Sequence, residues 1–211
     1  MRTHKIYAAI LLALLVLTAG CSGFLGEDQS FEASEISVSE NARSETGYQS
    51  ADGKEYTVEE TFGNDTEVSI TSHLSGYETE YDNGSGYFLG LATPKSEITG
   101  VEVNPLGEYD KKQLVSEVIS RSDSVDMEVE EGDLETVGNS TATVLETDVT
   151  VTTYNTTVER DGAEVEMRLH VTRLEHGEDY VIAVGVHPAA ADGGQGDIIT
   201  LLEGIEHDAG E

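Results

Sequence analysis

The chain has 211 residues, of which 42 are acidic and 11 are lysine or arginine, so its formal net charge is −31. It lacks the basic clusters that phosphate contacts need, which argues against nucleic acid and anionic lipid headgroups as partners. The acids are spread along alternating apolar patterns, which favours a folded domain over a disordered acidic tail. Repulsion among so many carboxylates is screened only at high salt, so we expect a surface adapted to molar salt.

An apolar run over residues 6–18 opens the chain, with Arg2 and Lys5 before it and the only cysteine, Cys21, just after it. This order of charged, apolar and small residues is typical of an export signal, and a cysteine at the cleavage point indicates a lipoprotein. We predict a lipoprotein signal peptide over residues 1–20 and a thioether-linked lipid on Cys21. A single transmembrane anchor is the first alternative, but the run is short for a bilayer. A plain secretory signal is the second.

The predicted domain organisation follows from this signal. Residues 21–30 contain the lipidated cysteine and a tether of Gly, Ser and acids, and residues 31–211 form a single extracytoplasmic domain. The signal contains two basic residues and no acid, so the mature chain would carry a charge of −33. With its cysteine lipidated it can form no disulfide, and a packed core must stabilise it.

In the first half of the domain, Ser39 is expected to cap a short helix that stops at Gly47. Alternation and apolar runs predict strands over residues 54–62, 66–81, 87–92 and 97–103. The continuous apolar character of 87–92 indicates a central strand that is buried on both faces.

In the second half, Asp110 is expected to cap a helix over 111–122, in which four apolar residues share one face. An alternating segment at 125–131 reads as a solvated strand. Asp161-Gly162 predicts a hairpin between two long strands, in which His170 would face water. A strand over 180–188 and a closing helix from Asp197 complete the domain.

Strands joined by hairpins, with few segregated helices, indicate the α+β class, with an antiparallel β-sheet packed under helices. The element order is also similar to that of small secreted α/β sandwich domains of the photosystem-accessory type. That likeness is one of architecture only.

Four of the six asparagines begin Asn-X-Ser/Thr triplets, namely Asn64, Asn83, Asn139 and Asn155. They are candidate N-glycosylation sites on an outward-facing domain. A Thr-rich strand protein can also produce such triplets through its composition alone.

No catalytic, cofactor or metal motif is found. The spacing of His170, His176, His187 and His207 does not match a zinc site, so we expect surface histidines. The acids at 126–133 lack the EF-hand order, and the glycines at 193–196 lack the Lys and Ser/Thr of a phosphate loop. No Gly-X-Ser-X-Gly motif is present. We therefore predict no catalytic residues, no cofactor and no metal.

Several segments together resemble a known family. They are LTAGCSGFL, FEAS with SENARSETGY, LATP, NPLGE, HVTRLEHGEDYVIAVGVHP and LLEGIEH. They look like a family of haloarchaeal lipoproteins catalogued only as a domain of unknown function, and the last 45 residues carry the most specific likeness. The resemblance implies an extremely halophilic archaeal source and brings no activity, cofactor or catalytic residue.

The functional expectation is a lipid-anchored protein on the outer face of the cell membrane, without catalytic activity, that binds or assembles an envelope protein. Its contact with the membrane would run through the lipid on Cys21. The first alternative is a solute-binding or hydrolytic lipoprotein whose cleft the sequence does not reveal. The second is a glycosylated structural element of the cell surface.

Overall fold

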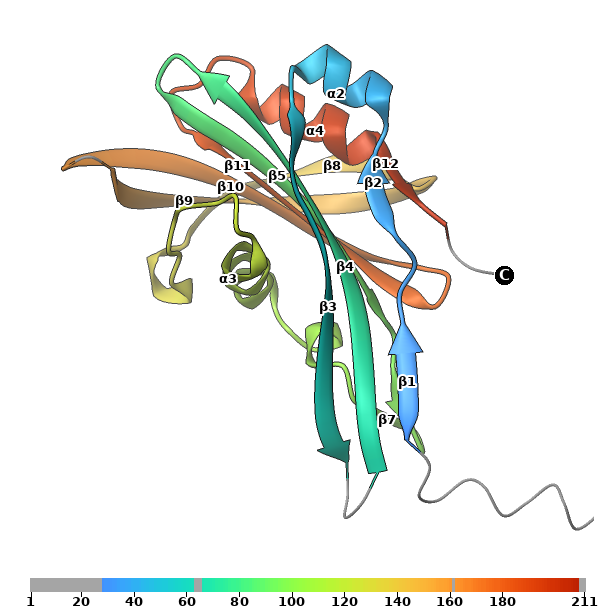
Figure 1. Ribbon diagram of the computed structural model, residues 1–211. Coiled ribbons are helices and arrows are strands. Elements are labelled where there is room, and N and C mark those ends of the chain that lie inside the picture. The colour runs from blue at the N-terminus through green and yellow to red at the C-terminus, as the bar shows by residue number, and fades with distance from the viewer. Residues whose placement is uncertain (1–27, 63–65, 161, 209–211) are drawn as a thin grey trace, which may run out of the picture. The chain divides into compact units, whose positions relative to one another are not determined.

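The computed structural model describes residues 28–62, 66–160 and 162–208 (Figure 1). Strands hold 58% of the described residues and helices 19%, in one large mixed sheet of eight strands with three short helices. The predicted α+β class is therefore wrong, and the likeness to an α/β sandwich is lost with it. The class differs because the long alternating segments form strands of up to 16 residues, whereas the three α-helices contain only 7 to 11 residues.

The described residues divide into two compact units. One comprises residues 28–30, 58–62 and 66–69, and the other comprises 31–57, 70–160 and 162–208. The apolar cores, the helices and the groove described below all belong to the second unit.

Seven strands follow one another in the large sheet. In sheet order they are β1 (Gln29–Glu32), β4 (Thr66–Tyr81), β5 (Gly84–Pro94), β11 (Asp179–Pro188), β10 (Ala163–His176), β9 (Thr147–Arg160) and β8 (Glu135–Val144). The eighth strand, β3 (Gln49–Phe62), pairs with β4. The α-helices are α2 (Glu40–Thr46), α3 (Lys111–Arg121) and α4 (Gly194–Glu203). The smaller elements are β2 (Ile36–Val38), β6 (Glu97–Ile98), β7 (Val101–Glu102), β12 (Ile205–His207) and the 3-10 turns η1 (Pro105–Gly107) and η2 (Glu131–Asp133).

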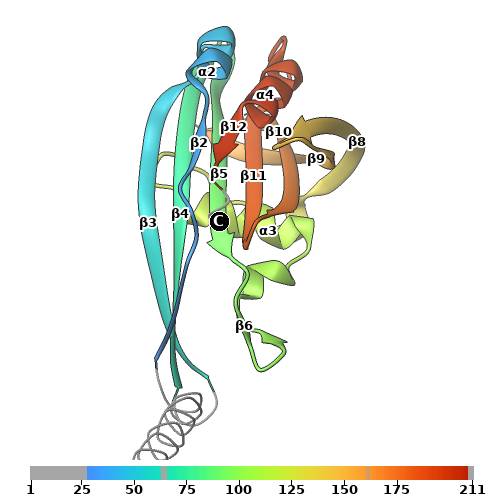
Figure 2. The ribbon, with the colours of Figure 1, turned by 90° about the vertical axis from the view of Figure 1, so that its right-hand side faces the viewer.

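Each face of the sheet carries its own apolar core. Helices α2 and α4 cover one face together with the paired strands β2 and β12, and α3 covers the opposite face (Figures 1 and 2). Strands β5 and β11 lie between the two cores, and Phe88 and Leu89 are fully buried on opposite faces. The prediction of a central strand over 87–92 is confirmed. Burial of one such side chain contributes about 2–3 kcal/mol relative to leaving it exposed.

The two capped helices were correctly predicted. Ser39 Oγ accepts a hydrogen bond from the Ala42 amide, and Gly47 ends α2 in the left-handed region at φ 77°. The Asp110 carboxylate accepts from the Gln113 amide, and the Gln113 side chain accepts from the Asp110 amide. Such a reciprocal pair satisfies two amides that the first turn of a helix leaves free.

Other predicted elements were wrong. Residues 97–103 form a small hairpin of β6 and β7 because Thr99 and Gly100 turn the chain at positive φ. Residues 125–130 form no strand, and α4 begins at Gly194 and not at Asp197. A hairpin between β8 and β9 turns at two non-glycine residues of positive φ, Leu145 and Glu146, where no glycine signals it. Strands β9 and β10 pair antiparallel from Arg160 and Ala163, as expected for the hairpin predicted at Asp161-Gly162, although Asp161 itself lies outside the described residues.

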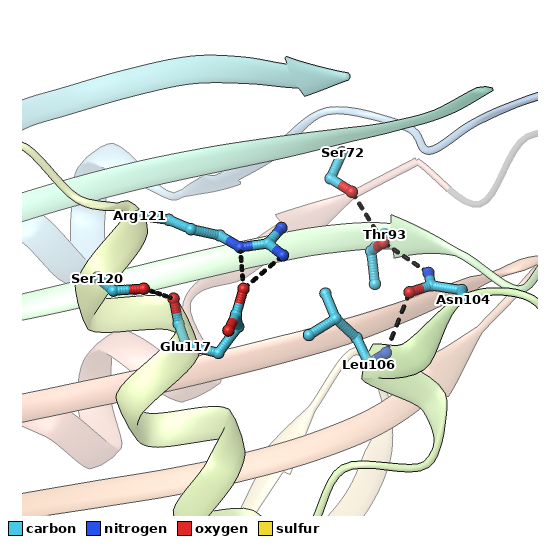
Figure 3. Close-up of polar contacts among 7 residues, drawn as sticks. All are labelled: Ser72, Thr93, Asn104, Leu106, Glu117, Ser120 and Arg121. Atoms are coloured by element: carbon cyan, nitrogen blue, oxygen red, sulfur yellow. Dashed lines mark hydrogen bonds and ion pairs between the residues drawn. The ribbon is translucent and has the colours of Figure 1, made fainter. Parts of the chain in front are cut away.

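A buried polar network holds the loop that follows β5 (Figure 3). Asn104 is 2% exposed, and its amide donates to Thr93 Oγ1 at 2.7 Å and to the Pro94 carbonyl at 2.7 Å. Ser72 Oγ also donates to Thr93, and Asn104 Oδ1 accepts from the Leu106 amide at 3.1 Å. One side chain therefore satisfies three groups that have little access to water.

The Asn104→Ala variant is expected to lower the free energy of unfolding by about 2–4 kcal/mol, because it removes three buried hydrogen bonds and leaves the Leu106 amide buried without its partner. Urea unfolding at native salt measures this loss. Ser120→Ala is the matched control, since Ser120 is exposed on α3 and should change stability by less than about 0.5 kcal/mol. Equal stability of the two variants would contradict the role of the network.

Candidate functional site

An open groove of about 950 Å³ lies beside the β2 and β12 strands. Most of its lining side chains are polar or charged. The lining residues are Glu32, Ala33, Ser34, Glu35, Ser37, Glu55, His73, Leu145, Ile205, Glu206, His207 and Asp208. The volume is within the range of ligand sites, but the lining is far more polar than that of a typical small-molecule pocket.

Three metal-ligating side chains meet in this groove. Glu32, Glu55 and His73 come from β1, β3 and β4, and their nearest ligand atoms all lie within 4.8 Å of one another. Strand pairing places them in a row. Thr57 Oγ1 and Thr71 Oγ1 share a hydrogen bond of 3.0 Å between β3 and β4, and the Ala33 amide donates to the Thr71 carbonyl. Glu55 is two residues from Thr57 and His73 is two residues from Thr71. They therefore lie on the same face as these threonines and opposite each other.

No lysine or arginine neutralises this row among the described residues. Lys54, the neighbour of Glu55 in the chain, points to the other side of β3 and pairs with Asp123. In the part of the chain that the structure describes, neither Glu32 nor Glu55 makes an ion pair or a side-chain hydrogen bond, and the His73 ring has no hydrogen-bond partner. The row therefore presents two carboxylates and one imidazole to the groove.

A second set of hydrogen-bonded residues adjoins the groove, and Ser34 and His207 of this set line it. Asp179 Oδ2 accepts from the Ser34 amide at 2.9 Å and from His207 Nε2 at 3.1 Å. His207 Nδ1 lies 2.9 Å from His176 Nδ1. When His207 is neutral, its Nδ1 can only accept, so His176 Nδ1 donates. These hydrogen bonds fix the ring of His207 and connect β12 to β11. Among the described residues, no hydroxyl group shares a hydrogen bond with the side chains of Asp179, His176 or His207.

A buried histidine pair lies beneath the start of α4. His170 and His187 are 1% and 2% exposed, and their Nε2 atoms lie 3.0 Å apart. His187 Nδ1 donates to the Pro188 carbonyl, so neutral His187 accepts at Nε2 from His170, and Thr153 donates to His170 Nδ1. Burial lowers the pKa of His170 to about 4 and also lowers the pKa of His187. The pair is a neutral structural element.

These positions overturn the prediction of surface histidines. His170, His187 and His207 are buried, because both faces of the sheet are covered at these strands. The alternating pattern of β10 suggested one solvated face, but α4 covers it. A Cβ atom at Gly194 would approach the His187 ring to 2.5 Å, so the helix rests directly on the pair.

Comparison with known families decides the classification. Residues 35–206 match the family described as a domain of unknown function, DUF6517. The chain belongs to this family. A search of curated proteins finds no match. For DUF6517 the description records no activity, so the groove and its donor groups are the starting point for a functional argument.

Not all the site residues predicted from sequence lie in the described part of this DUF6517 chain. Cys21 and Asn64 lie outside it. Asn83 is exposed in the turn before β5, and Asn139 is exposed on β8. Asn155 is half-buried on β9 and donates to Glu166 at 2.8 Å. No two of the described asparagines share a site. No described helix of this DUF6517 chain has the length and apolar character to cross a membrane.

The sequence analysis missed the row in the groove. Glu32, Glu55 and His73 are separated by 23 and 18 positions, and no local spacing links them. Among 42 acids, Glu32 and Glu55 carry no distinguishing signal. His73 was the better clue, since it is a single imidazole within a strand whose pattern was correctly predicted.

Proposed function

We propose that this protein is a lipid-anchored, extracytoplasmic binding module of a halophilic archaeon, and that it engages an envelope protein through the groove. The anchor rests on the cleavage pattern before Cys21, and the halophilic origin on the charge of −31 and the resemblance to haloarchaeal lipoproteins. The groove supplies the binding surface.

The polar, open character of the groove is the observation that carries this proposal. Five of its lining residues are acids, and only Ala33, Leu145 and Ile205 are apolar. A small-molecule or substrate site would favour an apolar, enclosed pocket with a few convergent polar groups. The groove instead suits a polar or cationic surface of a larger partner. The solute-binding and hydrolytic alternatives are accordingly less well supported.

Glycosylation of the same module is supported at two positions. The side chains of Asn83 and Asn139 are exposed, as a glycan acceptor requires, and neither lines the groove. The groove would therefore stay accessible on a glycosylated protein.

The Cys21→Ser variant is expected to lose stable membrane association, because it removes the atom that carries the lipid. Either the variant is released into the medium or its precursor stays uncleaved. Fractionation of cells and intact-mass analysis of the protein measure both outcomes. Normal processing and membrane retention of the variant would contradict the lipoprotein assignment.

The partner itself is tested by crosslinked co-purification of the full chain from its own membranes at native salt. We expect one reproducible, near-stoichiometric protein. Reversal of two groove charges, Glu35→Lys with Glu206→Lys, should abolish its recovery. The matched control is Asp126→Lys with Glu128→Lys, which changes the same charge at exposed positions outside the groove. Loss of the partner in both variants, or in neither, would contradict binding through the groove.

A further inference from the structure

We propose that Glu32, Glu55 and His73 form a binding site for a divalent transition-metal cation. The site goes beyond the proposed function, since partner binding through the groove does not require it. Three observations carry it: the convergence of the donors, their lack of protein partners and their position in a ligand-sized groove.

The geometry suits a single ion. The three ligand atoms lie within 4.8 Å of one another and come from three strands of one sheet. Two donors that are each about 2.1 Å from the same ion lie at most about 4.2 Å apart. Modest rotation of the two exposed glutamates would bring the three donors to that spacing, while the strands keep the backbone in place.

The partners of the other histidines single out His73. The described part of the chain contains five histidines, and four of them are paired through hydrogen bonds. His170 and His187 use their ring nitrogens on each other, Thr153 and Pro188, which leaves none for a ligand. Only His73 of the five has both ring nitrogens without a protein partner.

The charges of the three side chains also favour a bound cation. Two carboxylates and an imidazole converge without a lysine or arginine partner among the described residues. Carboxylates this close repel each other, and a bound cation would convert that repulsion into attraction. The types of ligand atom also indicate which ion would bind. Imidazole favours Zn²⁺ and similar transition metals, whereas Mg²⁺ and Ca²⁺ prefer oxygen ligands alone.

The groove would give solvent and ligands access to the bound ion. Its volume of about 950 Å³ adjoins all three donors, and His207 lies in the same lining. Three protein ligands leave coordination positions open, as in sites where water or an incoming group binds the metal. The ion would therefore be accessible from the groove.

The test is calorimetric titration of the full chain with Zn²⁺ at molar salt, in the presence of excess Mg²⁺. The Mg²⁺ occupies diffuse carboxylate sites, so one remaining Zn²⁺ site per chain is expected. Glu55→Gln and His73→Gln should each lower the Zn²⁺ affinity at least about tenfold. Both side chains are at least partly exposed, so near-UV circular dichroism should show that the variants are folded.

Glu35→Gln and Glu206→Gln are the matched controls, because both acids line the same groove outside the donor set. They should leave the Zn²⁺ affinity within about twofold. Equal losses in donor and control variants would show diffuse binding by surface charge and overturn the site, as would unchanged affinity in both donor variants. The result is independent of the partner experiment. Metal binding can fail while the envelope partner is still recovered, and metal can bind while no partner is recovered.

Discussion

Acidification from pH 6.5 to about 4 is expected to remove about 3 kcal/mol of stability through His170 alone. The pKa of this buried imidazole is lowered to about 4 in the folded protein, from an ordinary value of 6.5. Burial is the main cause, and the charges of His187 and Arg168 add to it. Protonation of His187 would place two N–H groups face to face across the 3.0 Å contact between His170 and His187. Protonation of His170 would direct a new Nδ1–H at the Thr153 hydroxyl.

The direction of the effect follows from proton binding. Above pH 6.5 His170 is neutral in both the folded and the unfolded chain, so its contribution to stability is complete. Between pH 6.5 and 4 the unfolded chain takes up a proton that the folded chain does not, and stability falls. Below about pH 4 both states are protonated and this loss stops growing. The other charged group near the pair is Asp197, which accepts a hydrogen bond from Tyr81.

Urea unfolding at a series of pH values, at constant high salt, measures the loss. The acids titrate in the same range, so the informative quantity is the difference between the wild type and His170→Gln. The glutamine can donate to His187 without taking a proton, and this variant should lose much of the pH dependence between 6.5 and 4. A folded-state pKa near 6.5 for His170 by NMR would contradict the prediction, as would identical pH profiles.

Transfer from molar to low salt is expected to unfold the protein. The chain carries 42 acids against 11 lysine and arginine residues, and these charges repel one another more in the compact state than in the unfolded chain. Screening is strong at 1 M salt, where the Debye length is about 3 Å, and weak at 0.01 M, where it is about 30 Å. The described part of the chain offers few ion pairs to offset this repulsion.

Near-UV circular dichroism during stepwise dilution of KCl measures the loss of packed structure. Sucrose, added in place of the salt, is the control, because it favours compact states by exclusion from the surface but screens no charge. We expect salt to restore the signal and sucrose to restore little of it. An unchanged spectrum at low salt, or full rescue by sucrose, would contradict an electrostatic cause.

Local signals in the sequence predicted part of this fold well. The caps at Ser39 and Asp110 identified α2 and α3, because hydrogen bonds within a few residues determine where those helices begin. The apolar run of β5 identified a strand that is buried on both faces. The hairpin between β8 and β9 was missed, because its turn at Leu145 and Glu146 carries no glycine.

The candidate site was harder to predict from the sequence than the fold. Cys21 and the four asparagines stand in short motifs, so their chemistry can be predicted from neighbouring residues alone. Glu32, Glu55 and His73 become neighbours only through the pairing of three strands. The burial of His170 depends in the same way on α4, which begins 24 residues later in the chain. Both features are tertiary, and alternation within one strand contains no information on either.

Site-specific photo-crosslinking in native membranes tests most directly the claim that the groove is the binding surface. A photoreactive amino acid would replace Ser37, which is exposed in the groove, or Ser120, which is exposed on α3 over the opposite face of the sheet. We predict a discrete crosslinked envelope protein from position 37 and none from position 120. Crosslinks of equal yield from both positions, or from position 120 alone, would contradict the assignment of the groove.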